Sequence, residues 1–332
     1  MHRQSPQSLF TMLKLAGRFI FTTMKTPYTK HFTSPHDLVS LLKNRGLAIK
    51  NEEKATAYIA NIGYYRLSSY FYPLLQSPKS EHIYKENTTF DLVMNMYRFD
   101  RKLRMLLFNE IEKIEVAIRS TILNVVTEEL NDVFWMTNPE NFHNQATFAK
   151  TINLIQSETE KTKEEFIAHF QTKYSDDFPP VWMIAEVIPF GTLGGIFNNL
   201  KSAKLKKKVS ARFGLSAPVF SSWIIALVNL RNLCCHHSRT WNREIAVVPV
   251  EPNSPVFPWI DSTKTNSKRI YYRICIIKHL LFTVSPNNRF TQKLKTLLAE
   301  YPTIDIRAIG FPVDWENEPL WKINLTNNKG QK

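Results

Sequence analysis

Residues 90–130 read F-D-L-V-M-N-M-Y-R-F-D-R-K-L-R-M-L-L-F-N-E-I-E-K-I-E-V-A-I-R-S-T-I-L-N-V-V-T-E-E-L, and this stretch decides the fold class. Apolar side chains recur in it at helical spacing: Leu92, Met96, Phe99, Leu103, Leu106, Ile111, Ile114, Ile118 and Ile122. Such a period predicts one long helix with a buried face. Glu115 and Arg119 are four residues apart on it and can form an ion pair.

Helix signals also occupy most of the remaining chain. Ser34-Pro35 is a good helix start and Gly46 a stop, and Asn51 and Gly63 delimit the next helix in the same way. Further helices are expected over residues 142–174, 181–200, 268–283 and 289–300, with a break at Pro189. We expect the aromatic stretch from Tyr64 to Pro73 to form a core layer, and Trp315 and Trp321 to dock on the core. The sequence therefore predicts an all-α fold.

The expected organisation is one helical domain between two loose ends. Residues 1–27 are predicted to be a flexible N-terminal extension, 28–322 the helical domain with 244–322 packed on its core, and 323–332 a frayed tail. Both Met1 and Met24 are candidate native starts. The apolar stretch from Leu9 to Met24 is too short for a membrane span and carries Lys14 and Arg18. We therefore expect no membrane partner and a cytoplasmic location.

The charge balance favours a polyanionic partner. Lys plus Arg number 43 against 29 Asp plus Glu, which leaves a formal charge of +14. Such an excess favours a protein that binds nucleic acid over one whose surface is merely basic. The densest basic run contains Lys204, Lys206, Lys207 and Lys208. This run is either a solvated helix face or a patch that binds the RNA backbone.

The cysteines predict neither a disulfide framework nor a metal site. Cys234, Cys235 and Cys275 are odd in number and two are adjacent. The run Cys-Cys-His-His at 234–237 cannot close a tetrahedron, because four contiguous helical side chains point in different directions. We expect no metal and no other cofactor.

Residues 216–241 carry the chemistry and read S-A-P-V-F-S-S-W-I-I-A-L-V-N-L-R-N-L-C-C-H-H-S-R-T-W. The helix they predict is apolar nearly all round, so we expect it to be buried. One sector breaks the apolar pattern: Ser222, Asn229, Asn232 and His236. A polar seam on a buried helix is either a structural network or a functional site.

Arg231 stands beside this seam and favours the functional interpretation. No acid in the segment can neutralise it, so an incoming phosphate is an attractive partner. Histidine can exchange protons near neutral pH, which makes His236 a candidate acid or base. The two residues lie roughly 140° apart on an ideal helix. They converge only if the arginine bends round, the helix loosens near Cys235, or two chains pool their residues.

The string R-N-L-C-C-H-H-S-R-T-W-N-R-E from Arg231 resembles the Abi-like (abortive infection, AbiD/AbiF-type) family of the HEPN superfamily of helical ribonucleases. Further similar strings are N-I-G-Y-Y-R-L-S-S-Y-F-Y-P from Asn61, F-D-R-K-L-R from Phe99, I-E-K-I-E-V-A-I-R from Ile111, F-G-T-L from Phe190 and G-F-P-x-D-W-E from Gly310. The resemblance thus spans about residues 28–321. One departure is Ser69, where the family usually has glycine.

The resemblance implies a HEPN-like helical bundle with additional helices, and a toxin-like endoribonuclease of anti-phage defence that needs no metal. It implies that a ribose 2′-OH attacks the adjacent phosphate, leaving a 2′,3′-cyclic phosphate. His236 would be the general acid or base, Arg231 would stabilise charge on phosphate, and Asn232 would hold the histidine or a phosphate oxygen. Secondary candidates for RNA contact are His237, Arg239 and Arg243. The resemblance also implies a homodimer, and a regulatory RNA or antitoxin as a further partner.

Two other functions remain open from the sequence. A non-catalytic HEPN protein could use the same residues to hold a regulatory or guide-like RNA. Alternatively, the seam could be a structural network in a protein-interaction dimer, which predicts no salt-dependent affinity for RNA.

Overall fold

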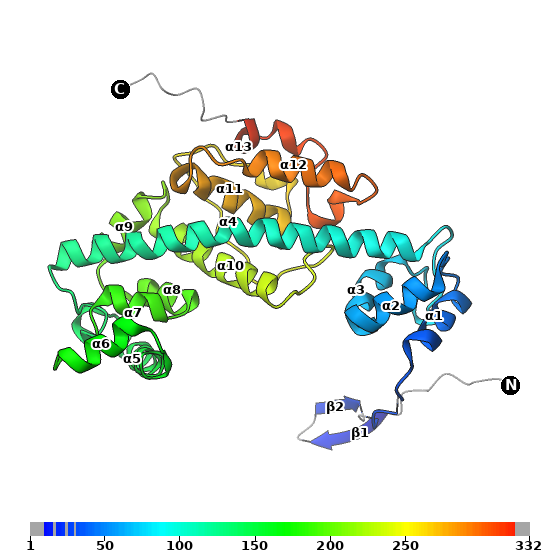
Figure 1. The fold of residues 1–332 in the computed structure, drawn as a ribbon, viewed down its shortest axis with the longest axis horizontal. Helices are drawn as coiled ribbons and strands as arrows, with labels where there is room; N and C mark the ends of the chain where they lie inside the picture. Colours follow the sequence, from blue (N-terminus) through cyan, green and yellow to red (C-terminus); the bar gives the residue numbers. More distant parts are fainter. Residues whose placement is uncertain (1–9, 16–17, 24–25, 30, 323–332) are drawn as a thin grey trace. The chain divides into compact units, whose positions relative to one another are not determined.

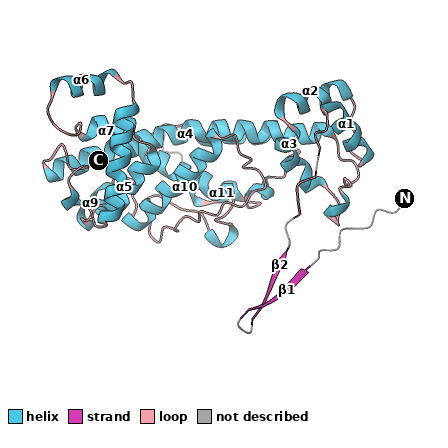
Figure 2. Cartoon of the chain, turned by 90° about the horizontal axis from the view of Figure 1, so that it is seen from below, coloured by secondary structure: helices cyan, strands magenta, loops and turns pink. Residues whose placement is uncertain are grey.

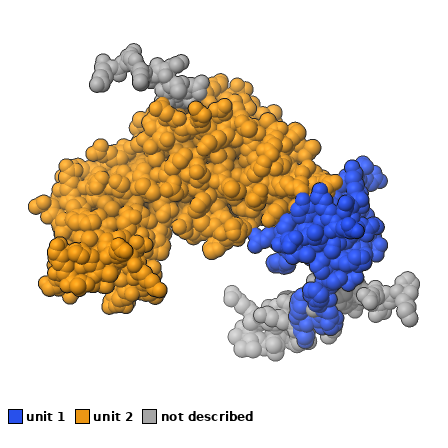
Figure 3. Space-filling view, in the orientation of Figure 1, with its two compact units in different colours: residues 1–68, 74–90 blue, residues 69–73, 91–332 orange. Residues whose placement is uncertain are grey.

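The computed structural model describes residues 10–15, 18–23, 26–29 and 31–322. The chain divides into two compact units, residues 1–68 with 74–90 and residues 69–73 with 91–332 (Figure 3). Apart from one hairpin, the regular elements of the described ranges are helices (Figure 2). The fold is all-α, as the sequence predicted. The domain limits at residues 27 and 322 were predicted from the sequence, and they stay predictions.

The first unit contains a hairpin and two capped helices. Strands β1 (Phe10–Leu15) and β2 (Arg18–Thr23) pair antiparallel, which the sequence did not predict. Helix α1 (Pro35–Asn44) begins after Ser34, whose Oγ accepts from the Asp37 N–H at 3.1 Å. Helix α2 (Glu52–Ile62) begins after Asn51 and ends at Gly63. Both predicted helix starts are confirmed.

The aromatic stretch from Tyr64 forms α3 (Tyr64–Phe71) and a short 3₁₀ turn, η1 (Tyr72–Leu74). Only part of it is core. Tyr70 and Phe71 are buried, whereas the Tyr65 side chain is 92% exposed. The hydroxyl-bearing rings therefore divide between core and solvent instead of forming one layer.

The long helix α4 (Phe90–Leu130) has the bounds that the apolar period predicted (Figure 1). From Asp91 onward it belongs to the second unit. Its inward face is fully buried, with Phe99, Leu103 and Ile114 at 0% exposure. The remaining helices of this unit are α5 (Gln145–Lys161), α6 (Glu165–Lys173), α7 (Val181–Val187), α8 (Phe190–Asn199), α9 (Ala203–Ala211), α10 (Ala217–Cys235), α11 (Ile270–Val284), α12 (Phe290–Glu300) and α13 (Pro319–Lys322). Further 3₁₀ turns are η2 (Lys79–Glu81), η3 (Pro139–Asn141), η4 (Ser262–Lys264), η5 (Ile306–Ile309) and η6 (Trp315–Asn317).

Helix α10 is the central helix of the second unit and packs against α8, α9 and α11. In the described chain it is the one helix long and apolar enough, by composition, to cross a membrane. From the sequence, only the apolar stretch at residues 9–24 was considered as a membrane span. The eight buried side chains of α10, among them Trp223 and Leu230, contribute to the core of this unit.

The C-terminal aromatic residues dock on α11, as predicted. Trp321 Nε1 donates to the Tyr271 hydroxyl at 3.0 Å, and the rings of Trp315 and Trp321 meet edge to face at 4.9 Å. Phe311 packs against both Tyr271 and Trp315. These contacts close the apolar core around α11, whose residues 270–282 are all buried. The predicted frayed tail at residues 323–332 lies outside the described residues.

Candidate functional site

Helix α10 ends in a tight turn that involves both histidines. His236 is the C-cap residue, and its N–H donates to the Asn232 carbonyl at 2.9 Å. His237 follows with φ of 54°, in the left-handed region. The turn is closed by His237 N–H to Cys234 O at 3.1 Å and Ser238 N–H to Leu233 O at 2.9 Å. This is a Schellman motif, in which glycine usually occupies the position of His237. Some backbone strain is therefore stored beside His236.

The polar seam of α10 is only partly buried, so the prediction that it is buried is wrong for its C-terminal half. Asn232 and His236 are exposed, and Ile225 within the same sector is 48% exposed. Ser222 and Asn229 are half-buried, and Ser222 Oγ accepts from the Val250 N–H at 2.8 Å. The apolar pattern of the sequence did not predict this exposure, because Ile225 is an apolar residue that no other element covers fully. Asn232 and His236 are thus accessible to a ligand from solvent.

Arg231 has an acidic neighbour that the sequence analysis did not identify. Its Nε lies 3.8 Å from Oε2 of Glu115 on α4. The other oxygen of Glu115 accepts from Arg119 Nη2 at 3.1 Å. Because one carboxylate serves two guanidinium groups, this cluster keeps a net positive charge. The segment itself carries no acid, as stated from the sequence, but Glu115 from another helix partly neutralises Arg231; the cluster still attracts an anion.

The three predicted catalytic side chains are only partly brought together. Arg231 Nη1 lies 3.5 Å from Asn232 Oδ1, at the outer limit of a hydrogen bond. The His236 side chain forms no hydrogen bond or ion pair with any described residue. A single chain therefore presents an arginine–asparagine pair and, one turn further on, an accessible imidazole.

The secondary arginines make structural contacts. Arg239 Nη1 donates to the Ser69 carbonyl at 3.0 Å, and burial lowers the pKa of this half-buried guanidinium. Arg243 Nη1 reaches the Arg239 carbonyl at 3.5 Å. His237 is exposed at the surface. The RNA contacts predicted for these three residues stay predictions.

The lysines of α9 differ in their availability. Lys208 pairs closely with Glu129, and Lys204 lies 3.5 Å from the same carboxylate. Lys206 Nζ donates to the Asn198 carbonyl at 2.6 Å, and partial burial lowers its pKa. Lys207 is exposed and has no such partner within the described residues. This surface remains positive, because one acid faces several lysines.

A buried carboxylate that was not predicted from the sequence holds the chain just beyond the closing turn of α10. Asp100 on α4 is 0% exposed and accepts from the Tyr70 hydroxyl and from Arg104 Nη1, each at 2.6 Å. It also accepts from the backbone N–H groups of Thr240 and Trp241, at 3.1 and 2.9 Å, and from the Thr240 hydroxyl. Burial, and then the Asp100 carboxylate, raise the pKa of Tyr70, which keeps its hydroxyl protonated as a donor.

Asp100 therefore fixes the chain just after the two histidines. The α4 sequence contained a signal for it, since Asp100 and Arg104 follow Met96 at successive steps of four and so lie on the buried stripe. A charged pair on such a stripe indicates a buried ion pair. Its partners at 240 and 241 lie too far away in sequence to be predicted from spacing.

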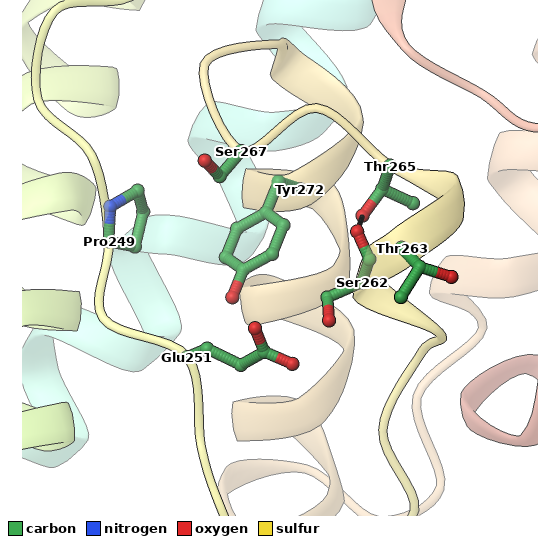
Figure 4. A pocket seen from close by; sticks show the side chains of 7 residues that line it. All are labelled: Pro249, Glu251, Ser262, Thr263, Thr265, Ser267 and Tyr272. Carbon is green, nitrogen blue, oxygen red and sulfur yellow. Dashed lines mark hydrogen bonds between the residues drawn. The ribbon is translucent and has the colours of Figure 1, made fainter.

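A hollow elsewhere in this unit lacks the charge that RNA needs. Figure 4 shows Glu251, from the loop after α10, pointing toward the Tyr272 hydroxyl beside Ser262. The other side chains lining it are Pro249 and three more hydroxyl residues. With a carboxylate and no cationic side chain, it disfavours a phosphate. The end of α10 is the better candidate site.

Comparison with known families agrees with this architecture. The model of the family described as Abi-like protein matches residues 57–242, more than half of the chain, from α2 to just beyond Trp241. The chain belongs to the Abi-like protein family. The match includes α4, α10 and the Asp100 network, and it associates the Abi-like chain with abortive infection. Neither the curated proteins nor the solved structures gave a match.

Proposed function

We propose that this Abi-like protein is an endoribonuclease of the HEPN superfamily that acts in abortive infection. It would cleave RNA without a metal, through attack of a ribose 2′-OH on the neighbouring phosphate. The observation that carries the proposal is the accessible His236 imidazole at the end of a buried helix, one turn from the Arg231–Asn232 pair.

The chemistry needs a proton acceptor for the 2′-OH and a cation for the phosphate. The His236 imidazole would take the proton, or deliver one to the leaving 5′ oxygen, an effect worth about 10²–10⁴-fold in rate. The Arg231 guanidinium would stabilise the extra charge on the pentacoordinate phosphate. Asn232 would orient the imidazole or a phosphate oxygen. The exposed Lys207 and its neighbours on α9 would attract the RNA backbone.

A second copy of the chain would complete this site. Within one chain Arg231 leans toward Glu115 on α4, while His236 faces solvent. The apolar side chain of Ile225, which is 48% exposed, lies on the same sector of α10 as Asn232 and His236. A two-fold axis beside Ile225 would place the two copies of α10 side by side. Arg231 of one chain would then serve His236 of the other.

Mixing two inactive variants tests whether the chains pool their residues. Arg231→Ala and His236→Ala would each be inactive, and the mixture would regain about a quarter of the wild-type rate. Half of the randomly mixed dimers are heterodimers, and each of these has one intact site out of two. No recovery after subunit exchange, verified by native mass spectrometry, would contradict a shared site.

The Glu115 contact supports a second candidate, a protein that binds RNA without cutting it. Glu115 offsets part of the Arg231 charge in the ground state, as in a structural ion pair. On this account His236→Ala would leave toxicity in cells unchanged. Loss of toxicity with RNA affinity retained within a few-fold would support the ribonuclease.

A further inference from the structure

We propose that the hollow between α4 and the end of α10 is a nucleotide-binding subsite, which holds the residue of single-stranded RNA next to the phosphate at His236. Its place in cleavage rests on the proposed function, but nucleotide binding can be tested without it. The hollow encloses about 290 Å³. Ligand sites of about this size or slightly larger accept a single small molecule.

The walls of the hollow come from two antiparallel helices. Helix α4 contributes Arg101, Arg104, Met105 and Phe108. The end of α10 contributes both adjacent cysteines and His237. Glu115 faces Arg231 further along, so the chain directions of α4 and α10 are opposed (Figure 1). His237 directly follows His236, which places the hollow beside the proposed reacting group.

The apolar part of the α4 wall suits a base. Phe108 is 39% exposed and Met105 is 62% exposed, although both are large apolar side chains. Aromatic rings at the surface of RNA-binding proteins stack with bases whatever the base identity. Methionine adds a polarisable and adaptable surface. Together they offer an apolar surface that would contribute to the binding of a planar base but not of a phosphate.

The basic part of the same α4 wall suits a phosphate. Arg101 is exposed and forms no hydrogen bond or ion pair with the described residues. Arg104 is already paired with Asp100, so Arg101 is the cation available to a ligand. No acidic side chain lines the hollow. Burial raises the pKa of the Cys234 thiol to about 12, so this cysteine adds no negative charge.

The C-terminus of a helix disfavours an anion, but here that effect is weakened. The carbonyls of Asn232, Leu233 and Cys234 each accept a backbone N–H in the closing turn. Their partial negative charges are therefore partly offset by the N–H groups that cover them. The net preference of the hollow is for a ligand with an apolar plane and one anionic group, which describes a nucleotide.

Calorimetric titration of the full chain tests this with three probes: adenosine 3′-monophosphate, adenosine and inorganic phosphate. We expect the nucleotide to bind at least 10-fold more tightly than either of the other two. Phe108→Ala would weaken nucleotide binding about 10-fold, the effect of one lost stacking contact, and leave phosphate binding unchanged. Arg101→Ala would weaken both, and Arg101→Lys would restore part of the loss.

Two matched variants serve as controls. Val116→Ala removes a 56% exposed apolar side chain from the same helix outside the hollow, and Lys150→Ala removes an exposed lysine from α5. Both should bind the nucleotide like the wild type. Because all four positions are partly or fully exposed, equal thermal midpoints would verify folding. Equal affinities for nucleotide and phosphate, or equal effects of Phe108→Ala and Val116→Ala, would overturn the subsite.

The outcome separates this proposal from the proposed function. If nucleotide binding depends on Phe108 and Arg101 but RNA is never cut, the subsite stands and the ribonuclease fails. If RNA is cut and neither substitution changes nucleotide affinity or KM, the ribonuclease stands and the subsite fails.

Discussion

The single side chain of Asp100 fixes the position of the segment that follows the two histidines. It is fully buried and accepts hydrogen bonds from Tyr70, Arg104 and the backbone at Thr240 and Trp241. A buried charge is tolerated only when its lone pairs are used in this way. The carboxylate thus links α4, the end of α3 and the chain beyond α10.

Asp100→Asn would lower the free energy of unfolding by about 3–5 kcal/mol, because it leaves Arg104 as an unpaired buried charge. Denaturant titration of both proteins measures the difference. Glu112→Gln is the control, since Glu112 is an exposed acid on the same helix and its loss should cost less than about 0.5 kcal/mol. Equal effects of the two substitutions would show that the Asp100 network does not stabilise the fold.

The candidate residues could be found from sequence, but their surroundings could not. Asn232 and His236 share a sector because helical periodicity fixes which side chains lie together. Periodicity does not say which sector the neighbouring helices leave open. It also could not reveal Glu115, since that residue is contributed by a helix distant in sequence. Solvent exposure and ion pairing are products of tertiary packing.

At the scale of elements, α8 and α10 approach closely at a glycine. A Cβ on Gly194 would lie 2.7 Å from Ile224 Cγ2, closer than packed carbon atoms allow. The adjacent Gly195 has open space around its Cα, with nothing within 4 Å of such a Cβ. The two positions therefore make a matched pair.

Gly194→Ala should destabilise the protein by about 1–3 kcal/mol, because the added methyl overpacks the contact with α10. Gly195→Ala should instead stabilise it by about 0.5–1 kcal/mol through helix propensity alone. Thermal unfolding of the two variants against the wild type gives both signs. If both substitutions stabilise, α8 and α10 are not in tight contact at this point.

The helices were predictable wherever local chemistry marks them. Ser34 and Asn51 begin helices by capping, and the apolar repeat of residues 90–130 continues without a helix breaker. The hairpin of β1 and β2 was not predicted, because residues 10–23 were considered only as a membrane span or a loose arm. The exposed side of α10 was also missed, because an apolar residue such as Ile225 need not be covered.

At the scale of the whole molecule, one buried histidine makes stability depend on pH. His279 is 0% exposed and packs against the rings of Trp223, Phe257 and Trp259 at 5.2–5.7 Å. Neither ring nitrogen makes a hydrogen bond of normal geometry in the described chain, although the Phe213 backbone lies near enough to oppose the effect of burial weakly. Burial lowers the pKa of His279 to about 4.

The folded state therefore favours the neutral ring, whereas the unfolded chain takes up a proton near pH 6.5. Stability should fall as the pH falls from 6.5 to 4, by up to ~3 kcal/mol from this residue. His279→Phe keeps an aromatic ring in the cage and should flatten the stability profile across this range. His36→Gln, at a side chain that is 79% exposed, should leave the slope unchanged. An unaltered slope in His279→Phe would contradict the account.

Composition alone gave the overall charge of +14 and indicated a helical protein. It could not predict the shape of the candidate site. The turn of α10, the cluster of Glu115 with two arginines and the hollow beside His237 each combine residues from separate helices. Spacing along one segment cannot supply such combinations.

Cleavage of end-labelled single-stranded RNA in EDTA, by the wild type, His236→Ala and Arg231→Ala, tests the central claim most directly. We predict that only the wild type cuts, that it leaves 2′,3′-cyclic phosphate ends, and that all three proteins keep RNA affinity within a few-fold. Equal cutting by all three, or no cutting by any while all bind RNA alike, would contradict a ribonuclease site at the end of α10.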